Sequence, residues 1–300
     1  MKNKITILTM ALLSLALVSN AQTHVFKVLS SQGMTEIKRG NKWTAITRGT
    51  KVFEGSKLRI KENGYIGIVH KSGKLIQLKK EGEYDVNTLA SKINVRSSSF
   101  ANKYGSYIAS KMSGSSSTSK SSAHMLGAVD RGTIPEDLAV LVSEDSHIRQ
   151  TPTVIKWKTK EEGPYEVLLI NLFDEVIFKT TTNDKQIELN LSGKEIEGDI
   201  CLLKVIPVKN PNALAYKRKL EIISGSKAVE ISNELSEIES ELDLNNALDN
   251  FFYATYFEDK GLNLEALHYY EQAMKMEPQV EDYKNAYNEF IVRQNIKVKE

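Results

Sequence analysis

Residues 247–278 read ALDNFFYATYFEDKGLNLEALHYYEQAMKMEP, and this stretch has the most regular spacing in the chain. Its small, aromatic and proline residues recur at intervals of 3, 4, 5, 4, 3 and 5 positions. They are Ala254, Phe257, Gly261, Ala266, Tyr270, Ala273 and Pro278. Intervals of three and four residues place side chains on one face of an α-helix, and proline cannot continue one. The stretch therefore predicts two packed helices that end at Pro278.

Counted from Ala247, these seven residues fall at positions 8, 11, 15, 20, 24, 27 and 32, and in this the stretch resembles a tetratricopeptide (TPR) repeat. Two positions depart from the repeat, with Asn250 where Trp is common and Tyr253 where Leu is common. The resemblance implies a helical hairpin in which Gly or Ala lets the helices approach and aromatic residues fill the gap. It also implies a module that binds peptides or protein segments and has no chemistry of its own.

A single repeat cannot bury both of its faces, so it needs neighbouring helices. The preceding apolar stripe has helical period and consists of Ile231, Leu235, Ile238 and Leu242. The following segment supplies Tyr283, Tyr287, Phe290 and Ile291 for a closing helix. We therefore expect a four-helix TPR-like domain over residues 226–300. The surface positions expected to bind a partner protein are Asn246, Asn250, Tyr253 and Glu258, although Tyr253 could instead belong to the core.

Residues 24–95 follow a different period. Short alternating segments, such as Lys57-Leu-Arg-Ile and Tyr65-Ile-Gly-Ile-Val, are separated by glycines at positions 33, 40, 49, 55, 64, 73 and 82. Alternation of apolar and polar residues is typical of β-strands, and glycine supplies turns that need positive φ. Many short strands with regular turns predict a β sandwich or roll.

The order of motifs in this region resembles a FecR-type β domain. The matching motifs are Gly40-Asn-Lys-Trp43, Ile46-Thr-Arg-Gly49, Gly55-Ser-Lys-Leu58-Arg-Ile, Gly64-Tyr-Ile-Gly-Ile-Val and Ser72-Gly-Lys-Leu-Ile-Gln-Leu78, with Ser72 in place of the usual Asp. The resemblance covers about a quarter of the chain and implies a periplasmic or surface module that contacts other molecules. Family members with a cytoplasmic tail relay a receptor's state to a sigma factor across the membrane. We expect neither a span nor such a tail here, so that role is not carried over.

Two connecting segments follow. Phe100, Tyr104, Ile108 and Met112 recur every four residues and predict a helix over 96–112. This helix could cover an open face of the adjacent sheet or dock on a membrane or partner, and we favour the first. Residues 113–123 contain seven serines in eleven positions, so we interpret 113–130 as a flexible Ser-rich linker.

Residues 134–224 return to an alternating pattern, with about seven strand-like segments. The phrases Thr151-Pro-Thr-Val-Ile-Lys-Trp157 and Gly163-Pro-Tyr165-Glu-Val resemble the second and third strands of an immunoglobulin-like or fibronectin-type sandwich. This resemblance implies a β sandwich with Trp157 in its core. Cys201, the single cysteine, lies in an apolar strand-like run, and we expect it to be buried.

The first 21 residues have the three parts of a secretory signal peptide. Lys2 and Lys4 precede an apolar run, and a small-residue exit ends at Ala21. We expect cleavage near Ala21 and a mature protein in the periplasm or outside the cell, with an uncleaved anchor as the alternative. No later stretch reaches the roughly 20 apolar residues of a membrane span.

Charge is distributed unevenly along the chain. Residues 22–125 carry 18 basic and 6 acidic residues (net +12), residues 126–225 carry 13 and 16 (net −3), and residues 226–300 carry 7 and 16 (net −9), so the sum is zero. Overall neutrality argues against nucleic-acid binding. The basic first region suggests an anionic cell-wall or surface glycan as an alternative ligand, held by Lys38, Arg39, Lys42, Arg48 and Lys51.

The sequence shows no local motif that is typical of a catalytic or metal site. The histidines stand singly at positions 24, 70, 124, 147 and 268, without the spacing of zinc ligands, and we expect His70 on the exposed side of a strand. We therefore expect no cofactor, no metal and no enzyme activity, although an active site assembled from distant residues stays open. The leading hypothesis is an exported, non-catalytic envelope protein that acts as a scaffold or sensor by binding partner proteins through its FecR-like and TPR-like modules.

Overall fold

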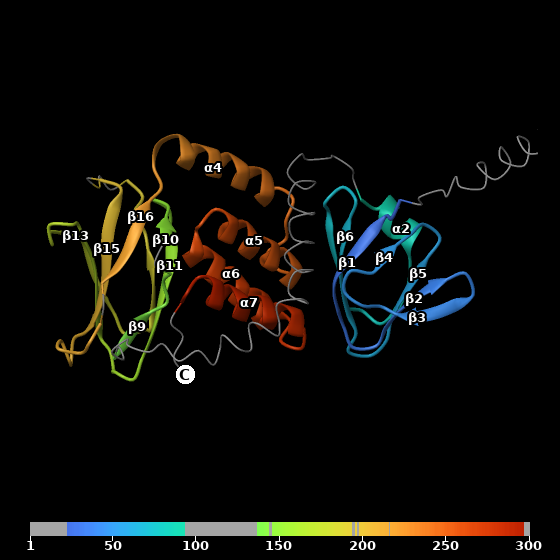
Figure 1. The fold of residues 1–300 in the computed structure, drawn as a ribbon, viewed down its shortest axis with the longest axis horizontal. Coiled ribbons are helices and arrows are strands. Elements are labelled where there is room, and N and C mark those ends of the chain that lie inside the picture. The colour runs from blue at the N-terminus through green and yellow to red at the C-terminus, as the bar shows by residue number, and fades with distance from the viewer. Residues whose placement is uncertain are drawn as a thin grey trace, which may run out of the picture.

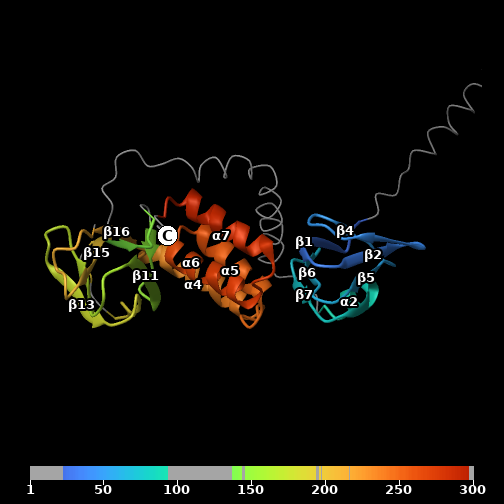
Figure 2. The ribbon, with the colours of Figure 1, turned by 90° about the horizontal axis from the view of Figure 1, so that it is seen from below.

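The computed structural model describes residues 23–93, 137–143, 146–193, 196, 198–215 and 217–296. These residues form two β modules and one helical module (Figure 1). Figures 1 and 2 agree that helices α4 to α7 lie between the two β modules, although they come last in the sequence. The expected order of β modules followed by helices is confirmed along the chain, but in space the helical module is central.

The first β module is a sandwich of two antiparallel sheets, with strand orders β4-β1-β6-β7 and β3-β2-β5-β8. Its elements are β1 (Phe26–Gln32), β2 (Thr35–Arg39), β3 (Lys42–Ala45), β4 (Lys51–Val52), β5 (Lys57–Ile60), β6 (Tyr65–His70), β7 (Leu75–Leu78), β8 (Gly82–Asp85) and the short helix α2 (Val86–Ser91). Both sheets contribute to one core, in which Phe26, Ile37, Leu58 and Ile68 are at most 1% exposed. The expected β architecture of this region is therefore confirmed in its coarse form.

One expectation for this module is wrong. His70 is 6% exposed rather than exposed. Its ring lies 5.1 Å from the ring of Phe26, and its Nδ1 is 2.7 Å from the Ser72 hydroxyl. Strand β6 is buried along its whole length, because one of its faces lies on the module's core and the other contacts the helical module. Alternation alone does not reveal a strand buried on both faces.

The second β module is also a sandwich. Its strands are β9 (Leu138–Val140), β10 (Ser146–Ile148), β11 (Thr153–Thr159), β12 (Tyr165–Ile170), β13 (Val176–Thr182), β14 (Gln186–Leu189), β15 (Ile200–Pro207) and β16 (Arg218–Ile222). They form sheets in the orders β14-β11-β9 and β10-β16-β15-β12-β13, around one shared core. Trp157 is 2% exposed and Cys201 is fully buried, as expected. Burial raises the pKa of the Cys201 thiol to about 11, which keeps it protonated and unreactive.

The helical module contains α4 (Gly225–Glu239), α5 (Ala247–Asp259), α6 (Asn263–Met276) and α7 (Glu281–Arg293), which confirms a helical region of four helices among the described residues. The two helices expected from residues 247–278 are α5 and α6. Gly261 stands between them with φ +72°, and a Cβ there would lie 2.8 Å from Nδ1 of His147. Glycine is therefore needed both for the turn and for the close approach of the second β module.

Three expectations fall on residues outside those described: the signal peptide of 1–21, the helix of 96–112 and the Ser-rich linker of 113–130. Among the described residues, no helix has both the length and the apolar character needed to cross a membrane.

Candidate functional site

The positions expected to bind a partner on the helical module are mostly not on its surface. Asn250 and Tyr253 are each 2% exposed and Glu258 is 8% exposed. Every residue of α5 from Ala247 to Glu258 is buried. The expectation of a surface location is therefore wrong for Asn250 and Glu258, because α5 is buried around its whole circumference.

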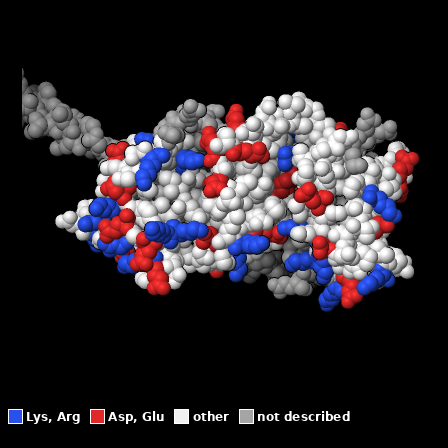
Figure 3. Space-filling model, turned by 180° about the vertical axis from the view of Figure 1, so that it is seen from behind, with Lys and Arg blue, Asp and Glu red and all other residues white. Residues whose placement is uncertain are grey.

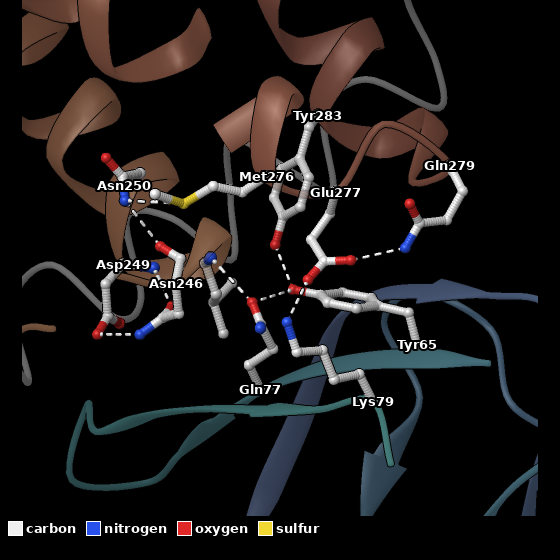
Figure 4. A network of polar contacts seen from close by, with 11 residues as sticks. Tyr65, Gln77, Lys79, Asn246, Asp249, Asn250, Met276, Glu277, Gln279 and Tyr283 are labelled. Atoms are coloured by element: carbon white, nitrogen blue, oxygen red, sulfur yellow. Dashed lines mark hydrogen bonds and ion pairs between the residues drawn. The ribbon is translucent and has the colours of Figure 1, made fainter. Parts of the chain in front are cut away.

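Each of these side chains has a contact within the fold. Asn246 caps α5, with its Oδ1 accepting a hydrogen bond from Asp249 N at 2.8 Å. Asn250 Nδ2 donates to the carbonyl oxygen of Asn246 at 2.8 Å (Figure 4). It also donates to the carbonyl oxygen of Leu244 at 2.7 Å, and the two bonds fix the loop before α5. Glu258 accepts hydrogen bonds from Arg293 Nε at 2.9 Å and from the Tyr270 hydroxyl at 2.7 Å. Asn246 and Asn250 thus fix the start of α5, and Glu258 joins α5 to α6 and α7.

Tyr253 packs among the aromatic residues of the helical module. Its ring lies 5.4 Å from that of Phe257 and 4.9 Å from that of Tyr269, both with edge-to-face geometry. The alternative that Tyr253 belongs to the core is therefore the correct one.

The first β module docks on the helices through buried and partly buried polar contacts (Figure 4). The Tyr65 hydroxyl contacts the Tyr283 hydroxyl and donates to Gln77 Oε1 at 3.2 Å. Lys79 Nζ lies 2.9 Å from Glu277 Oε1. Burial raises the pKa of both Tyr65 and Tyr283 well above the ordinary tyrosine value. Both hydroxyls therefore keep their protons to a higher pH than an exposed tyrosine does.

A second group of contacts at this interface pairs opposite charges. Asp282, at the start of α7, accepts a hydrogen bond from Ser30 Oγ at 2.8 Å and lies 3.1 Å from Arg48 Nη1. Arg48 is one of the residues expected to hold a glycan, and the structure assigns it instead to this interface. Part of the charge asymmetry along the chain is thus used internally, since the basic first module contacts the acidic helical module.

The second β module docks on α6. Arg149 Nε lies 3.3 Å from Glu265 Oε1, Lys156 pairs with Glu271, and Asn263 Nδ2 donates to Ser143 Oγ at 2.8 Å. Burial raises the pKa of the Glu265 carboxyl, because desolvation penalises its charged form. Both β modules therefore contact the helical module, which we had expected to bind a different polypeptide.

An exposed cavity of about 440 Å³ lies on the first β module, between the β2–β3 hairpin and the segment that contains β4. We call this cavity the basic mouth. Its lining residues are Ile37, Arg39, Thr44, Ala45, Gly49, Thr50, Lys51 and Phe53. Arg39 spans the opening, since its Nη2 donates to the Lys51 carbonyl oxygen at 2.6 Å and its guanidinium lies 5.6 Å from the Phe53 ring centre.

Positive charge gathers at the basic mouth by strand register. Arg39 is directly opposite Lys42 in the β2–β3 pair, and Lys51 is directly opposite Lys27 in the β1–β4 pair. Like charges directly opposite each other destabilise a sheet. Among the described residues, Glu36 and Glu83 of this module pair with Arg59 and Lys61, and no ion pair involves Arg39, Lys42 or Lys51. The three cations are therefore available to an external anion.

The structure divides the five residues expected to hold a glycan. Arg39 and Lys51 line the basic mouth, and Lys42 stands beside it. Lys38 points to the other face of the sheet, where its Nζ lies 5.9 Å from the Trp43 ring centre. Thr44, Thr50 and Phe53 were missed by sequence reasoning, although two of them stand in the segment Thr50-Lys-Val-Phe53, where a basic residue lies between a hydroxyl and an aromatic ring.

One face of the molecule is less polarised than the sequence suggests. On the face drawn in Figure 3, Lys and Arg lie interspersed with Asp and Glu. Among the described residues, no group of three His, Cys, Asp or Glu side chains is placed to hold a metal ion. The basic mouth is lined by two cations, two hydroxyls, an aromatic ring and small or apolar groups. Such groups can bind an anionic or hydroxyl-rich ligand through hydrogen bonds and stacking.

No protein-family profile and no curated protein matches the chain. Among solved structures, the chain is similar to PorZ of Porphyromonas gingivalis, described as an essential bacterial surface component of the type-IX secretion system, with 10% identity and a TM-score of 0.22. The match covers 62% of this chain and 24% of PorZ, so the chain spans about a quarter of the PorZ chain. A similarity at this TM-score carries no argument about fold or role. The fold and site define a multi-module protein in which helices join two β sandwiches and one sandwich carries an exposed basic cavity.

Proposed function

We propose that this protein is an exported, non-catalytic protein of the bacterial cell envelope that binds an anionic glycan through the basic mouth. The observation that carries the proposal is the cluster of Arg39, Lys42 and Lys51, held together by strand register without a carboxylate partner among the described residues. A sheet is less stable when like charges lie directly opposite each other on neighbouring strands. Binding of an acidic sugar offsets that cost.

The lining suits an acidic sugar in particular. A guanidinium presents paired donors to a carboxylate, sulfate or phosphate, whereas an ammonium acts as a point charge. The hydroxyls of Thr44 and Thr50 can bond sugar hydroxyls, and the Phe53 ring offers an apolar surface for a pyranose face. The contact of Arg39 with the Lys51 carbonyl holds the guanidinium at the opening before the ligand arrives, which reduces the entropic cost of binding.

The proposed location and family relationships rest on the sequence. Residues 1–21 have the pattern of a signal peptide with cleavage near Ala21, which supports a periplasmic or secreted protein. The first module has the sandwich that a FecR-like domain implies, the second has the two sheets of an immunoglobulin-like domain, and α5 with α6 has the hairpin of a TPR-like repeat. We propose these three relationships on that basis.

Sedimentation with insoluble, purified cell wall and with beads carrying alginate tests the proposal, with dextran beads as the neutral control. We expect binding to the two anionic materials that weakens as salt is raised. The variant R39E/K51E should lose about tenfold or more in affinity, since a hydrogen bond to a charged group is worth about 1.5–3 kcal/mol. The variant K80E, which changes an exposed lysine that does not line the basic mouth, is the matched control. Failure to bind at any salt concentration, or equal binding by R39E/K51E and K80E, would overturn the proposal.

A partner protein remains a second candidate ligand, through a different surface from the one expected. The helical module contacts the chain's own β modules, but the second β module exposes a group of large apolar side chains, Leu172, Phe173 and Val176. Cross-linking in intact cells, with the wild type and with F173S, tests this candidate. Recovery of a specific envelope protein by the wild type alone supports it, and recovery of the same proteins by both contradicts it.

A further inference from the structure

The turn between β12 and β13 presents a rigid apolar tip. Leu172 is 63%, Phe173 85% and Val176 57% exposed. The side chain of Asn171 organises the turn, because its Oδ1 accepts hydrogen bonds from Phe173 N and Glu175 N, both at 2.9 Å. A large aromatic side chain exposed on a preorganised turn is costly in water and can bind with little loss of conformational entropy.

The basic mouth has the complementary chemistry. Ile37, Ala45 and Phe53 give it apolar walls, and Arg39 and Lys51 supply positive charge beside them. The tip carries two carboxylates next to its exposed ring, on Asp174 and Glu175. An apolar side chain flanked by acids thus matches an apolar cavity flanked by bases.

Within the described part of the chain, the carboxylates of the tip have exposed or local partners. Asp174 pairs with Lys217, and Glu175 Oε2 accepts from Asn171 Nδ2 at 2.7 Å. The Asp174 and Lys217 side chains are 69% and 40% exposed, and exposed ion pairs contribute about 0–1 kcal/mol. Exchanging such a pair for a contact with Arg39 or Lys51 therefore costs little.

The two features cannot meet within one molecule. In Figures 1 and 2, strand β13 lies at one end of the long axis and strands β2 and β3 lie at the other, with the helical module between them. We propose that the Phe173 tip of one copy inserts into the basic mouth of a second copy, with Asp174 and Glu175 facing Arg39 and Lys51. Because the two surfaces differ, the contact is head-to-tail. Because they lie at opposite ends of the long axis, each added copy extends the row, and we expect linear assemblies.

This inference goes beyond the proposed glycan binding and does not depend on it, since assembly is measured without any polyanion. The two ligands share one cavity, however. A soluble acidic polysaccharide that occupies the basic mouth should therefore dissociate the assemblies, whereas a polysaccharide that binds elsewhere should leave them intact.

Sedimentation velocity of the purified protein over a wide concentration range tests the proposal. We expect the average mass of the wild type to keep rising with concentration past the dimer. F173S and R39E should each remain monomeric, while the controls V208S, which changes another exposed apolar residue of the same module, and K80E should assemble like the wild type. Circular dichroism melting curves confirm that all four variants are folded.

Mixing the two inactive variants gives the sharpest result. F173S keeps an intact basic mouth and R39E keeps an intact tip, so an equimolar mixture should form dimers and stop there. A wild type that stays monomeric at every concentration, assembly of F173S like V208S, or a mixture that stays monomeric would each overturn the inference. Failure of assembly together with salt-sensitive binding to alginate would leave the glycan proposal standing, so the two failures are distinguishable.

Discussion

Replacing Tyr65 by Phe removes the hydroxyl that joins the first β module to α7. The Tyr65 hydroxyl contacts the Tyr283 hydroxyl and donates to Gln77 Oε1, and the Tyr283 side chain is fully buried. A buried polar group without a partner costs about 1–3 kcal/mol. We therefore expect Y65F to weaken docking of the module by about 1–3 kcal/mol, because it leaves the Tyr283 hydroxyl without its partner.

The reverse change should cost less. In Y283F the Tyr65 hydroxyl keeps Gln77 as its acceptor, so only a satisfied hydrogen bond is lost, at about 0.5–1.5 kcal/mol. The double variant removes both hydroxyls and leaves neither unpaired. It should therefore be less destabilised than the sum of the two single variants, with a coupling energy of about 1 kcal/mol.

Hydrogen exchange measured by mass spectrometry is the appropriate assay, because a protein of several modules need not unfold in one step. Protection of backbone amides in β6 and α7 reports opening of this interface directly. Y287F is the control, since Tyr287 lies on the same helix and is only partly buried. Equal protection in Y65F and Y287F, together with zero coupling, would refute the docked arrangement.

Two further predictions concern the same packing. Burial raises the pKa of Tyr65 and Tyr283, so their contribution to stability is complete below the ordinary tyrosine pKa of about 10 and is lost as the pH rises above it. Melting followed by circular dichroism across alkaline pH should therefore show a smaller loss of stability in Y65F/Y283F than in the wild type. Identical loss of stability in the two proteins would contradict this. G261A should destabilise the protein more than G193A. Both positions have φ of about +70°, where an alanine costs about 1–3 kcal/mol, but only a Cβ at 261 would approach His147, at 2.8 Å. Equal melting temperatures for the two variants would show that the close approach has no cost.

The position of the helical module changes the role that its sequence suggests. Contacts such as Arg48 with Asp282 and Arg149 with Glu265 join α7 and α6 to β modules that precede them by more than 100 residues. The helices therefore lie between the two β sandwiches and connect them. The two surfaces that we propose for ligands lie on the β modules, at the two ends of the molecule (Figure 1).

Much of the candidate site was within reach of the sequence. The excess of basic residues in the first region pointed to Arg39, Lys42 and Lys51, which the structure brings to the basic mouth. The same reasoning could not separate them from Lys38, because side-chain direction depends on strand register and on where the hairpin extends beyond the core. It also placed Arg48 with them, although the partner of Arg48 lies 234 positions further along the chain.

The sequence by itself determined the order of β regions and helices and many of the apolar core residues, since both follow from local periods of two and of three to four residues. Ile231, Trp157 and Cys201 are buried as their patterns required. Only the tertiary structure decided what covers each apolar face. Asn250 and Glu258 are buried and form hydrogen bonds within the fold, and Tyr65 contacts Tyr283, 218 positions away. Packing joins surfaces by shape and charge regardless of their separation in the chain.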